Sequence, residues 1–296
     1  MKTLGCCFTA LMICCFSHAQ EGVLVLQSDF GVRDGAVAAM KGVAVSVSAE
    51  LKIFDLTHEI TPYDIWEAAH RLNQSASYWP AGTVFVSVVD PGVGSERKSV
   101  VMKSTSGHYF VTPDNGTLTL VAENLGVEEV REIDESTNRR SNSNDSYTFH
   151  GRDVYAYTGA RLAARLISFE EVGKKLPSEV KRISYKKAVL KDQKIIGSID
   201  VLDIRYGNVW TNIPHSILRE LEVEYGEVLD VVIFHEDKMV FQGKIPFGKT
   251  FSSVPSGQPV AYLNSLLNFS IALNMGNFAA TYRIESGPSW KVMVSK

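Results

Sequence analysis

The sequence predicts an α/β domain with a mostly parallel sheet and helices on both faces, followed by an all-β, barrel-like domain. In the first half, short apolar runs alternate with segments of helical periodicity. After residue 188 the pattern changes to short alternating runs separated by Gly, Pro, Asn and Asp turns, which is typical of a small barrel or sandwich. The basic, weakly patterned stretch 174–187 separates the two patterns, so the predicted domains are residues 20–182 and 188–296.

The individual elements follow from the same periodicities. In the first domain, strands are expected at residues 23–26, 51–56, 83–89, 99–103 and 108–112, and helices at 35–49, 63–78, 115–124 and 154–166. In the second domain, strands are expected at 195–201, 228–234, 239–243, 260–263 and 290–294. The segment 135–146 is polar and rich in Ser and Asn, which indicates a loop and makes it a candidate for mobility.

Composition limits the class of protein. Of the 296 residues, 45% are hydrophobic and 21% charged, which is typical of a soluble globular chain with enough apolar material for a core. The formal net charge is −3, and no block of basic residues stands out. A nucleic-acid-binding face would need such a cluster, so the composition argues against that partner.

The N-terminus has the layout of a secretory signal peptide. Lys2 precedes an apolar run at residues 4–16, and Ser17-His18-Ala19 places small residues at the positions that a signal peptidase reads. We therefore expect residues 1–19 to be removed and the mature protein to be periplasmic or secreted, without a membrane anchor. The run is too short to span a bilayer as a stable helix. Two alternatives remain open, a buried N-terminal helix and a lipoprotein acylated at Cys14.

All four cysteines lie in this leader, at positions 6, 7, 14 and 15. The mature chain would then contain no cysteine. Disulfides, thiolate catalysis and Cys-ligated metals are therefore excluded for it.

Three polar clusters follow predicted strands, where ligands of an α/β sheet bind. They are Ser28-Asp29-Phe30-Gly31-Val32-Arg33-Asp34-Gly35, Asp90-Pro91-Gly92-Val93-Gly94-Ser95-Glu96-Arg97 and Phe149-His150-Gly151-Arg152-Asp153. Neither of the two glycine-rich nucleotide motifs occurs, and a carboxylate at each turn would repel a phosphate. Phosphate binding is therefore rejected.

Each of these side chains also has an ordinary structural interpretation. Asp29 and Asp34 suit helix N-caps, and Asp90 before Pro-Gly suits a turn. Arg97 suits a solvated surface charge, and His150 suits a satisfied core or capping histidine. Taken one by one, the residues therefore do not establish a site.

Taken together, the motifs resemble the S-adenosyl-L-methionine hydroxide adenosyltransferases, or adenosine-forming S-adenosylmethionine hydrolases, which are relatives of the fluorinase and chlorinase enzymes. The resemblance runs through nearly the whole mature chain. Its motifs, in order, are Ser28-Asp29-Phe30-Gly31 with Asp34, Asp55-Leu56-Thr57-His58, Thr83-Val84-Phe85, Asp90-Pro91-Gly92-Val93-Gly94 with Arg97, Pro113-Asp114-Asn115-Gly116, Thr148-Phe149-His150-Gly151-Arg152-Asp153, Gly207-Asn208-Val209-Trp210-Thr211-Asn212 and Tyr262-Leu263-Asn264-Ser265.

The resemblance implies a homotrimer whose active sites lie between the first domain of one subunit and the second domain of the next. It implies hydrolysis of S-adenosyl-L-methionine to adenosine and methionine by a water held by Asp90, Arg97 and His150. The substrate-binding residues it implies are Asp29, Asp34, Tyr63, Phe149, Asp203, Tyr206, Asn208, Ser265 and the backbone near Met275. One position departs from the halogenating relatives, which carry an arginine where this chain has Leu266.

The implied residue types suit the implied chemistry. The sulfonium leaves as a neutral thioether, so the difficulty lies in water as a weak nucleophile that must be aligned with the breaking bond. A carboxylate at position 90 accepts a proton from that water, a guanidinium at 97 orients the carboxylate, and an imidazole at 150 adds a hydrogen bond. No metal or redox cofactor is needed. An ionised Asp90 also disfavours a halide ion beside it.

Two other classes of protein fit parts of the sequence. A non-catalytic periplasmic module that binds adenosine or S-adenosylmethionine is the main alternative, because the leader predicts export whereas the substrate is made in the cytosol. A secreted polysaccharide-binding sandwich suits only the second half of the chain and fails on the α/β half.

Overall fold

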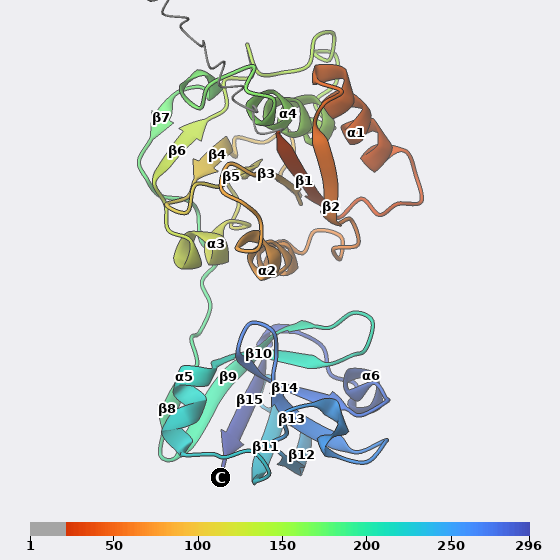
Figure 1. Ribbon diagram of the computed structural model, residues 1–296, viewed down its shortest axis with the longest axis vertical. Coiled ribbons are helices and arrows are strands. Elements are labelled where there is room, and N and C mark those ends of the chain that lie inside the picture. The colour runs from red at the N-terminus through yellow and green to blue at the C-terminus, as the bar shows by residue number, and fades with distance from the viewer. Residues whose placement is uncertain (1–21) are drawn as a thin grey trace, which may run out of the picture.

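The computed structural model describes residues 22–296, so the predicted signal peptide at 1–19 lies outside the described residues. Figure 1 shows two domains joined by one extended connection. The first domain ends with the short strand β7 (Lys175–Leu176), and the second begins with β8 (Val189–Lys191). Among residues 22–296, no helix combines the length and the apolar character needed to cross a membrane.

The first domain is built on a seven-stranded mixed sheet. Its strands are β1 (Val23–Ser28), β2 (Lys52–Thr57), β3 (Val84–Val88), β4 (Ser99–Lys103), β5 (Tyr109–Pro113), β6 (Glu129–Glu132) and β7, in the order β2-β1-β3-β5-β4-β6-β7. Strands β2, β1, β3 and β5 run parallel, whereas β4, β6 and β7 pair in antiparallel fashion. The prediction of a mostly parallel sheet therefore holds for β2, β1, β3 and β5, whereas the sheet as a whole is mixed. The tight turn at 104–107, closed by a bond from the Gly107 N–H to the Ser104 carbonyl, returns the chain directly into β5.

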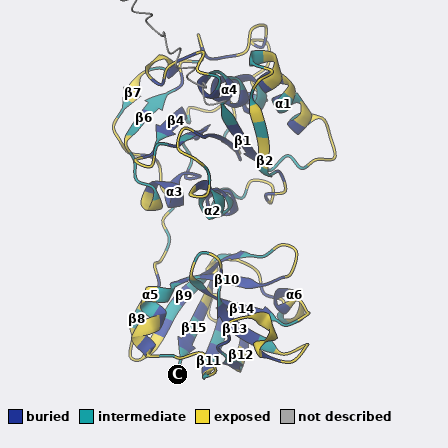
Figure 2. Ribbon diagram, in the orientation of Figure 1, coloured by how far each residue is buried: buried dark blue, intermediate teal, exposed yellow. Residues whose placement is uncertain are grey.

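Helices cover both faces of this sheet, as the alternating strand residues require. The helices are α1 (Ala36–Val47), α2 (Ile65–Ala76), α3 (Thr119–Asn124) and α4 (Tyr157–Ala163). Leu24 and Leu26 of β1 pack in one core with α1 and α4, whereas Val25 packs in a second core with α2 and α3. This alternation is the period of two expected for a strand buried on both faces. Figure 2 shows the buried strands lying between the two helical layers.

The second domain is an antiparallel sheet that is nearly closed into a barrel. It contains β8, β9 (Lys194–Leu202), β10 (Val209–Pro214), β11 (Val228–His235), β12 (Lys238–Pro246), β13 (Pro259–Leu263), β14 (Asn268–Leu273) and β15 (Gly287–Ser295). The order is β12-β11-β15-β9-β10-β14-β13, with β8 beside β9. The two ends of this order meet at a single bridge between Phe247 and Ala261. The short helices α5 (His215–Leu218) and α6 (Phe278–Tyr282) modify the all-β prediction.

The element predictions are largely confirmed, with ends displaced by a few residues. The predicted helix at 115–124 shortens to α3, and the predicted helix at 154–166 becomes α4 preceded by a π-helical segment, Gly151–Ala156. Strands β6, β7, β8, β10 and β14 were not predicted. They are short or interrupted by polar residues, so their own sequence does not favour a strand. Pairing with neighbouring strands stabilises them.

Candidate active site

Four loops of the first domain meet at the carboxyl ends of β1, β2 and β3, where ligands of open α/β sheets bind. They enclose a pocket of about 280 Å³. Its lining includes Asp29, Tyr63, Asp90, Phe149 and His150. Five of the predicted site residues are thus brought together from segments far apart in the sequence.

Asp90 and Arg97 form a buried ion pair at this pocket. Arg97 Nε lies 2.9 Å from Asp90 Oδ1, and Nη2 lies 2.6 Å from Oδ2. The side chains of Arg97 and Asp90 are only 8% and 6% exposed. Burial alone lowers the pKa of Arg97, but the hydrogen bond to Asp90 and the neighbouring Tyr155 raise it above its usual value. The interpretation of Arg97 as a solvated surface charge is therefore wrong.

The turn 90–97 brings the two side chains face to face. The Val93 N–H donates to the Asp90 carbonyl, and the Ser95 N–H donates to the Gly92 carbonyl. Gly94 has φ +78°, a left-handed conformation that glycine adopts without strain. The chain then re-enters the sheet at β4, which leaves Arg97 pointing back at Asp90.

His150 lies on the other side of Arg97. Its Nδ1 is 2.9 Å from Arg97 Nη2, and the ring is buried where the π-helical segment begins. Burial is the largest cause that lowers the pKa of His150; Arg97 and Arg139 lower it further, whereas Glu135 and Asp90 oppose them. The ring is therefore held in its neutral form near neutral pH.

Further polar side chains form a shell around these three residues. The sequence did not predict these side chains as part of the site. Ser99 Oγ accepts from Arg97 Nη1 at 3.0 Å and contacts both Glu135 Oε1 and the Tyr155 hydroxyl at 3.2 Å. The Tyr155 hydroxyl also donates to Asp90 Oδ2 at 3.4 Å, and burial raises the pKa of Tyr155. Only Tyr155 had a sequence signal, because it stands next to the His150 motif in an otherwise apolar run.

The loop 135–146 contributes to this shell. It contains no helix or strand, as predicted. Its central side chains are nevertheless buried, with Asn138, Arg139 and Ser143 each less than a tenth exposed. Arg139 Nη1 donates to Glu135 Oε2 at 3.0 Å and lies 3.5 Å from His150 Nε2. A segment that looks like a surface loop in the sequence therefore packs against the site.

Two predicted substrate residues of the first domain contact each other. Asp29 Oδ2 accepts from the Tyr63 backbone N–H at 2.9 Å, and Tyr63 has φ +69° with 72% of its surface exposed. Phe149 packs edge-to-face on Phe30, with ring centroids 5.6 Å apart. Asp34 does not line the pocket; its Oδ1 accepts from the Ala36 N–H at 2.9 Å. The N-cap of α1 is Gly35, so the interpretation of Asp34 as the N-cap is wrong.

The predicted residues of the second domain lie apart from this pocket. Asp203 Oδ1 accepts from the backbone of Arg205 and Tyr206, and Asn208 Nδ2 donates to Asp203 Oδ2 at 3.4 Å. Ser265 and Met275 are exposed in other loops, and Met275 is 88% exposed. None of the five lines the pocket that contains Asp90. Within one chain, the predicted site is therefore divided between the two domains.

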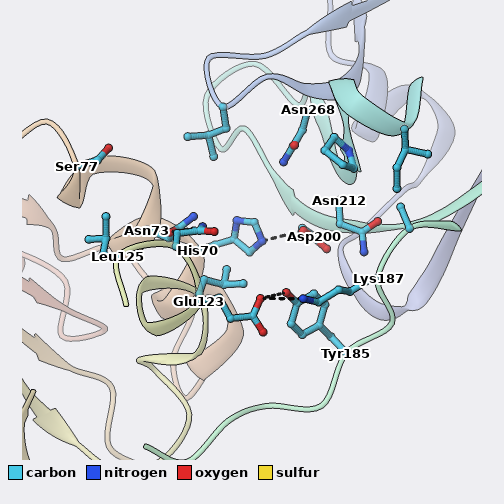
Figure 3. Close-up of a pocket in the computed structure, with 16 residues that line it drawn as sticks. His70, Asn73, Ser77, Glu123, Leu125, Tyr185, Lys187, Asp200, Asn212 and Asn268 are labelled. Carbon is cyan, nitrogen blue, oxygen red and sulfur yellow. Dashed lines mark hydrogen bonds and ion pairs between the residues drawn. The ribbon is translucent and has the colours of Figure 1, made fainter. Parts of the chain in front are cut away.

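A larger pocket of about 480 Å³ lies between the domains and has a different character (Figure 3). Its ionisable groups are paired with one another: His70 Nε2 lies 3.0 Å from Asp200 Oδ2, and Glu123 accepts from the Tyr185 hydroxyl at 2.6 Å. Trp66 Nε1 and Arg71 Nη2 also donate to the backbone of β9. These contacts join the two domains, although His70 Nε2 itself makes no hydrogen bond. Within residues 22–296, no group of three or more His, Cys, Asp or Glu side chains is arranged to hold a metal ion.

Comparisons with known proteins agree with the two-domain division. Residues 24–173 match the SAM hydroxide adenosyltransferase N-terminal domain, and residues 197–291 match the C-terminal domain of the same family. An (R)-S-adenosyl-L-methionine hydrolase of Methanocaldococcus jannaschii is 38% identical over 77% of this chain and 80% of its own length. A fluorinase of Actinopolyspora mzabensis is 28% identical over 91% of this chain and 96% of its own.

The fold has a close counterpart among solved structures. The crystal structure of an uncharacterized conserved protein from Thermotoga maritima superposes with a TM-score of 0.85, at 33% identity, over 92% of this chain and all of that protein. The two domains of the family therefore match this chain in order, and the solved structure covers both halves of the fold. The chain belongs to the SAM hydroxide adenosyltransferase family.

Proposed function

We propose that the protein hydrolyses S-adenosyl-L-methionine to adenosine and L-methionine by attack of an activated water on C5′. The observation that carries this function is the buried Asp90–Arg97 pair with His150 at the edge of a pocket. Relatives named (R)-S-adenosyl-L-methionine hydrolase support the same activity. The reaction forms the C5′–O bond as the C5′–S bond breaks, and the thioether sulfur keeps the electron pair.

Asp90 is the group that receives the proton of the attacking water. Its Oδ2 already accepts from Arg97 Nη2 at 2.6 Å and from the Tyr155 hydroxyl at 3.4 Å. Its Oδ1 has the single close partner Arg97 Nε at 2.9 Å. A carboxylate oxygen has two acceptor positions, so Oδ1 retains one for water. General-base assistance of this kind contributes on the order of 10²–10⁴-fold in rate.

The same carboxylate argues for water over halide as the nucleophile. A halide placed against Asp90 would meet a buried negative charge, and the repulsion is large where water is scarce. Water instead gains a hydrogen bond there. We therefore expect hydrolysis, although a relative named fluorinase is similar in sequence over 91% of this chain.

We propose that the complete site forms between subunits of a homotrimer. The residues assigned to substrate binding in the second domain do not reach the Asp90 pocket of the same chain. Several of them are exposed apolar or aromatic side chains, including Tyr206 and Met275, and Tyr63 of the first domain is exposed as well. A heterologous contact that brings Asp203 and Tyr206 of one subunit over Asp29 and Tyr63 of the next would cover these surfaces. Sedimentation that gives a monomer at all micromolar concentrations would contradict this assembly.

We further propose that the protein is exported and that the leader is cleaved after Ala19. N-terminal sequencing of the exported protein tests this. An intact Met1, or an acylated Cys14, would refute it.

The activity is tested with the protein lacking residues 1–19. It is incubated with S-adenosyl-L-methionine, with and without chloride or fluoride, and the products are identified by chromatography. We expect adenosine and methionine in equal amounts, at a rate independent of halide. A 5′-halo-adenosine that rises with halide concentration would overturn the proposal, and so would binding of the substrate without turnover.

A further inference from the structure

His150 lies between two buried arginines. Arg97 Nη2 approaches its Nδ1 at 2.9 Å, and Arg139 Nη1 approaches its Nε2 at 3.5 Å. The side chains of Arg139 and His150 are only 5% and 6% exposed. Water therefore screens these charges weakly.

The positions of the protons follow from this geometry. A guanidinium has N–H donors and no acceptor, so Nδ1 of His150 must accept from Arg97 and cannot carry a proton. The neutral ring then has its proton on Nε2, which faces Arg139. Two N–H groups do not hydrogen-bond, so Arg139 acts on the ring through its charge. A second proton on His150 would break the Arg97 contact and add a third positive charge to the cluster.

The cluster is balanced by two carboxylates. Asp90 pairs with Arg97, and Glu135 Oε2 accepts from Arg139 Nη1 at 3.0 Å. The second oxygen of Glu135 accepts from Ser99 Oγ, which itself accepts from Arg97 Nη1. With His150 neutral, the four ionised groups carry no net charge. The Tyr147 ring lies beside the His150 ring, with centroids 6.4 Å apart, and the Tyr155 hydroxyl donates to Asp90 Oδ2.

We propose that Arg139, which Glu135 holds beside the ring, is a positioning residue for the proposed hydrolysis. It acts by keeping His150 neutral, so that His150 accepts from Arg97 and leaves the bidentate Arg97–Asp90 pair undistorted. The inference rests on the proposed function. It gives the loop 135–146 a role in the reaction without contact to the reacting atoms. Arg97 Nη2 is shared between Asp90 and His150, so a protonated ring would push this nitrogen away from the carboxylate.

Arg139 also tethers its loop, and a test must separate that effect. Its Nη2 donates to the carbonyls of Ser146 at 2.8 Å and Ser143 at 3.3 Å. Arg161 offers a matched control, because it donates to the carbonyl of Thr137 at 2.9 Å and to Asn138 Oδ1 at 2.7 Å in the same loop. Arg161 is not among the charged groups that shift the pKa of His150. Arg161→Gln therefore loosens the loop without changing the charge around the ring.

The experiment is a histidine-ring NMR titration of the protein lacking residues 1–19, with the His150 signal assigned by its loss in His150→Gln. We expect Arg139→Gln to raise the pKa of His150 by about one pH unit or more, because a neighbouring positive charge is removed. Glu135→Gln should lower it, and Arg161→Gln should leave it unchanged. Arg139→Lys keeps the charge and should restore the wild-type pKa.

The kinetic readout is the pH profile. In Arg139→Gln the acid limb of kcat should move upward with the His150 pKa, which lowers kcat by up to about tenfold on that limb, while KM stays near wild type. An unchanged His150 pKa in Arg139→Gln, or a raised one in Glu135→Gln, would overturn the proposal. If Arg139→Gln fails to fold, the pKa of His150 in Glu135→Gln and in Arg139→Lys still tests the proposal. If the wild-type protein does not turn over substrate, the proposed function fails, whereas the titration still tests the arginine pair.

Discussion

The guanidinium of Arg97 holds the carboxylate of Asp90 in a two-nitrogen fork, with Nε 2.9 Å from Oδ1 and Nη2 2.6 Å from Oδ2. A bidentate pair of this kind fixes both the position and the rotation of the carboxylate. Asp90 is therefore presented to the pocket in one orientation, with Oδ1 the less occupied oxygen. This geometry is what a proton acceptor for a single bound water requires.

Asp90→Asn should lower kcat by roughly 10²–10⁴-fold and leave KM almost unchanged. Asn has nearly the shape of Asp and can still contact the water, but it is a far weaker proton acceptor. The lost interaction is one made mainly in the transition state. Steady-state kinetics check this, with Asp203→Ala as the comparison. The proposed partner of Asp203 is a non-reacting part of the substrate, so Asp203→Ala should raise KM before it lowers kcat. A near wild-type rate for Asp90→Asn would remove Asp90 from the mechanism.

Two impaired variants should complement each other if the site spans two subunits. Asp90→Asn alters the first domain and Asp203→Ala the second, so a mixed trimer contains some sites with both residues intact. Each proposed site takes its first domain from one subunit and its second domain from the next. In a random equal mixture, roughly a quarter of the sites therefore have both Asp90 and Asp203 intact. We expect co-refolded or co-expressed mixtures to regain activity well above either variant alone, at substrate concentrations below KM. Activity that equals the average of the two variants would place both residues in one chain's site, or Asp203 outside the site.

The contact between His70 and Asp200 should stabilise the joint between the domains. His70 is on α2 and Asp200 on β9, their closest atoms are 3.0 Å apart, and both side chains are more than nine-tenths buried. Ser198 Oγ also donates to Asp200 Oδ1 at 2.9 Å. Asp200→Ala leaves the partly buried Ser198 hydroxyl without its acceptor and removes the carboxylate beside His70, so the free energy of unfolding should fall by about 1–3 kcal/mol. Asp230→Ala, which removes an exposed pair with Lys244, should cost less than about 1 kcal/mol. Urea denaturation measures the free energy of unfolding of both variants. Equal losses in the two would show that Asp200 does not stabilise the joint between the domains.

Stability should fall as the pH drops below the ordinary histidine range. His58 is buried, with Nδ1 2.7 Å from Ser28 Oγ and Nε2 3.0 Å from Asp55 Oδ1. Burial, the largest cause, lowers the pKa of His58 from 6.5, and Asp55 only partly offsets it; the pKa of His150 is lowered too. A lowered folded pKa means that protonation favours the unfolded chain. The stability is therefore fully present above pH 6.5 and is lost as the pH falls through the folded pKa.

Thermal unfolding between about pH 8 and pH 5 measures this effect. His58→Gln should have a lower Tm than wild type at the alkaline end, because its bonds to Ser28 and Asp55 are changed. Its Tm should also depend less on pH across the acid part of the range. A Tm that falls as steeply in His58→Gln as in wild type would show that other groups cause the acid sensitivity.

Local sequence was sufficient for most elements and for the motifs of the site. The apolar runs of β1 and β3 and the polar turn after each predicted a ligand-binding edge of the sheet, and Asp90, Arg97 and His150 do meet there. The direction of each strand was harder to predict from the sequence. The antiparallel placement of β4 depends on a four-residue turn and on its pairing with β6, which lies far along the chain. An alternating run of apolar residues is the same in either direction.

The sequence by itself determined which residue types stand at the loop positions of the family, because those identities are local facts. Only the tertiary structure decided which of them share a pocket. The loop 135–146 lacks periodicity, yet Arg139 is buried against His150 because long-range packing brings the two segments together. Asp203 and Tyr206 belong to the same implied set of substrate-binding residues as Asp29, yet they lie on another domain. Burial and proximity are properties of the packed chain, and they make a polar loop part of the candidate site.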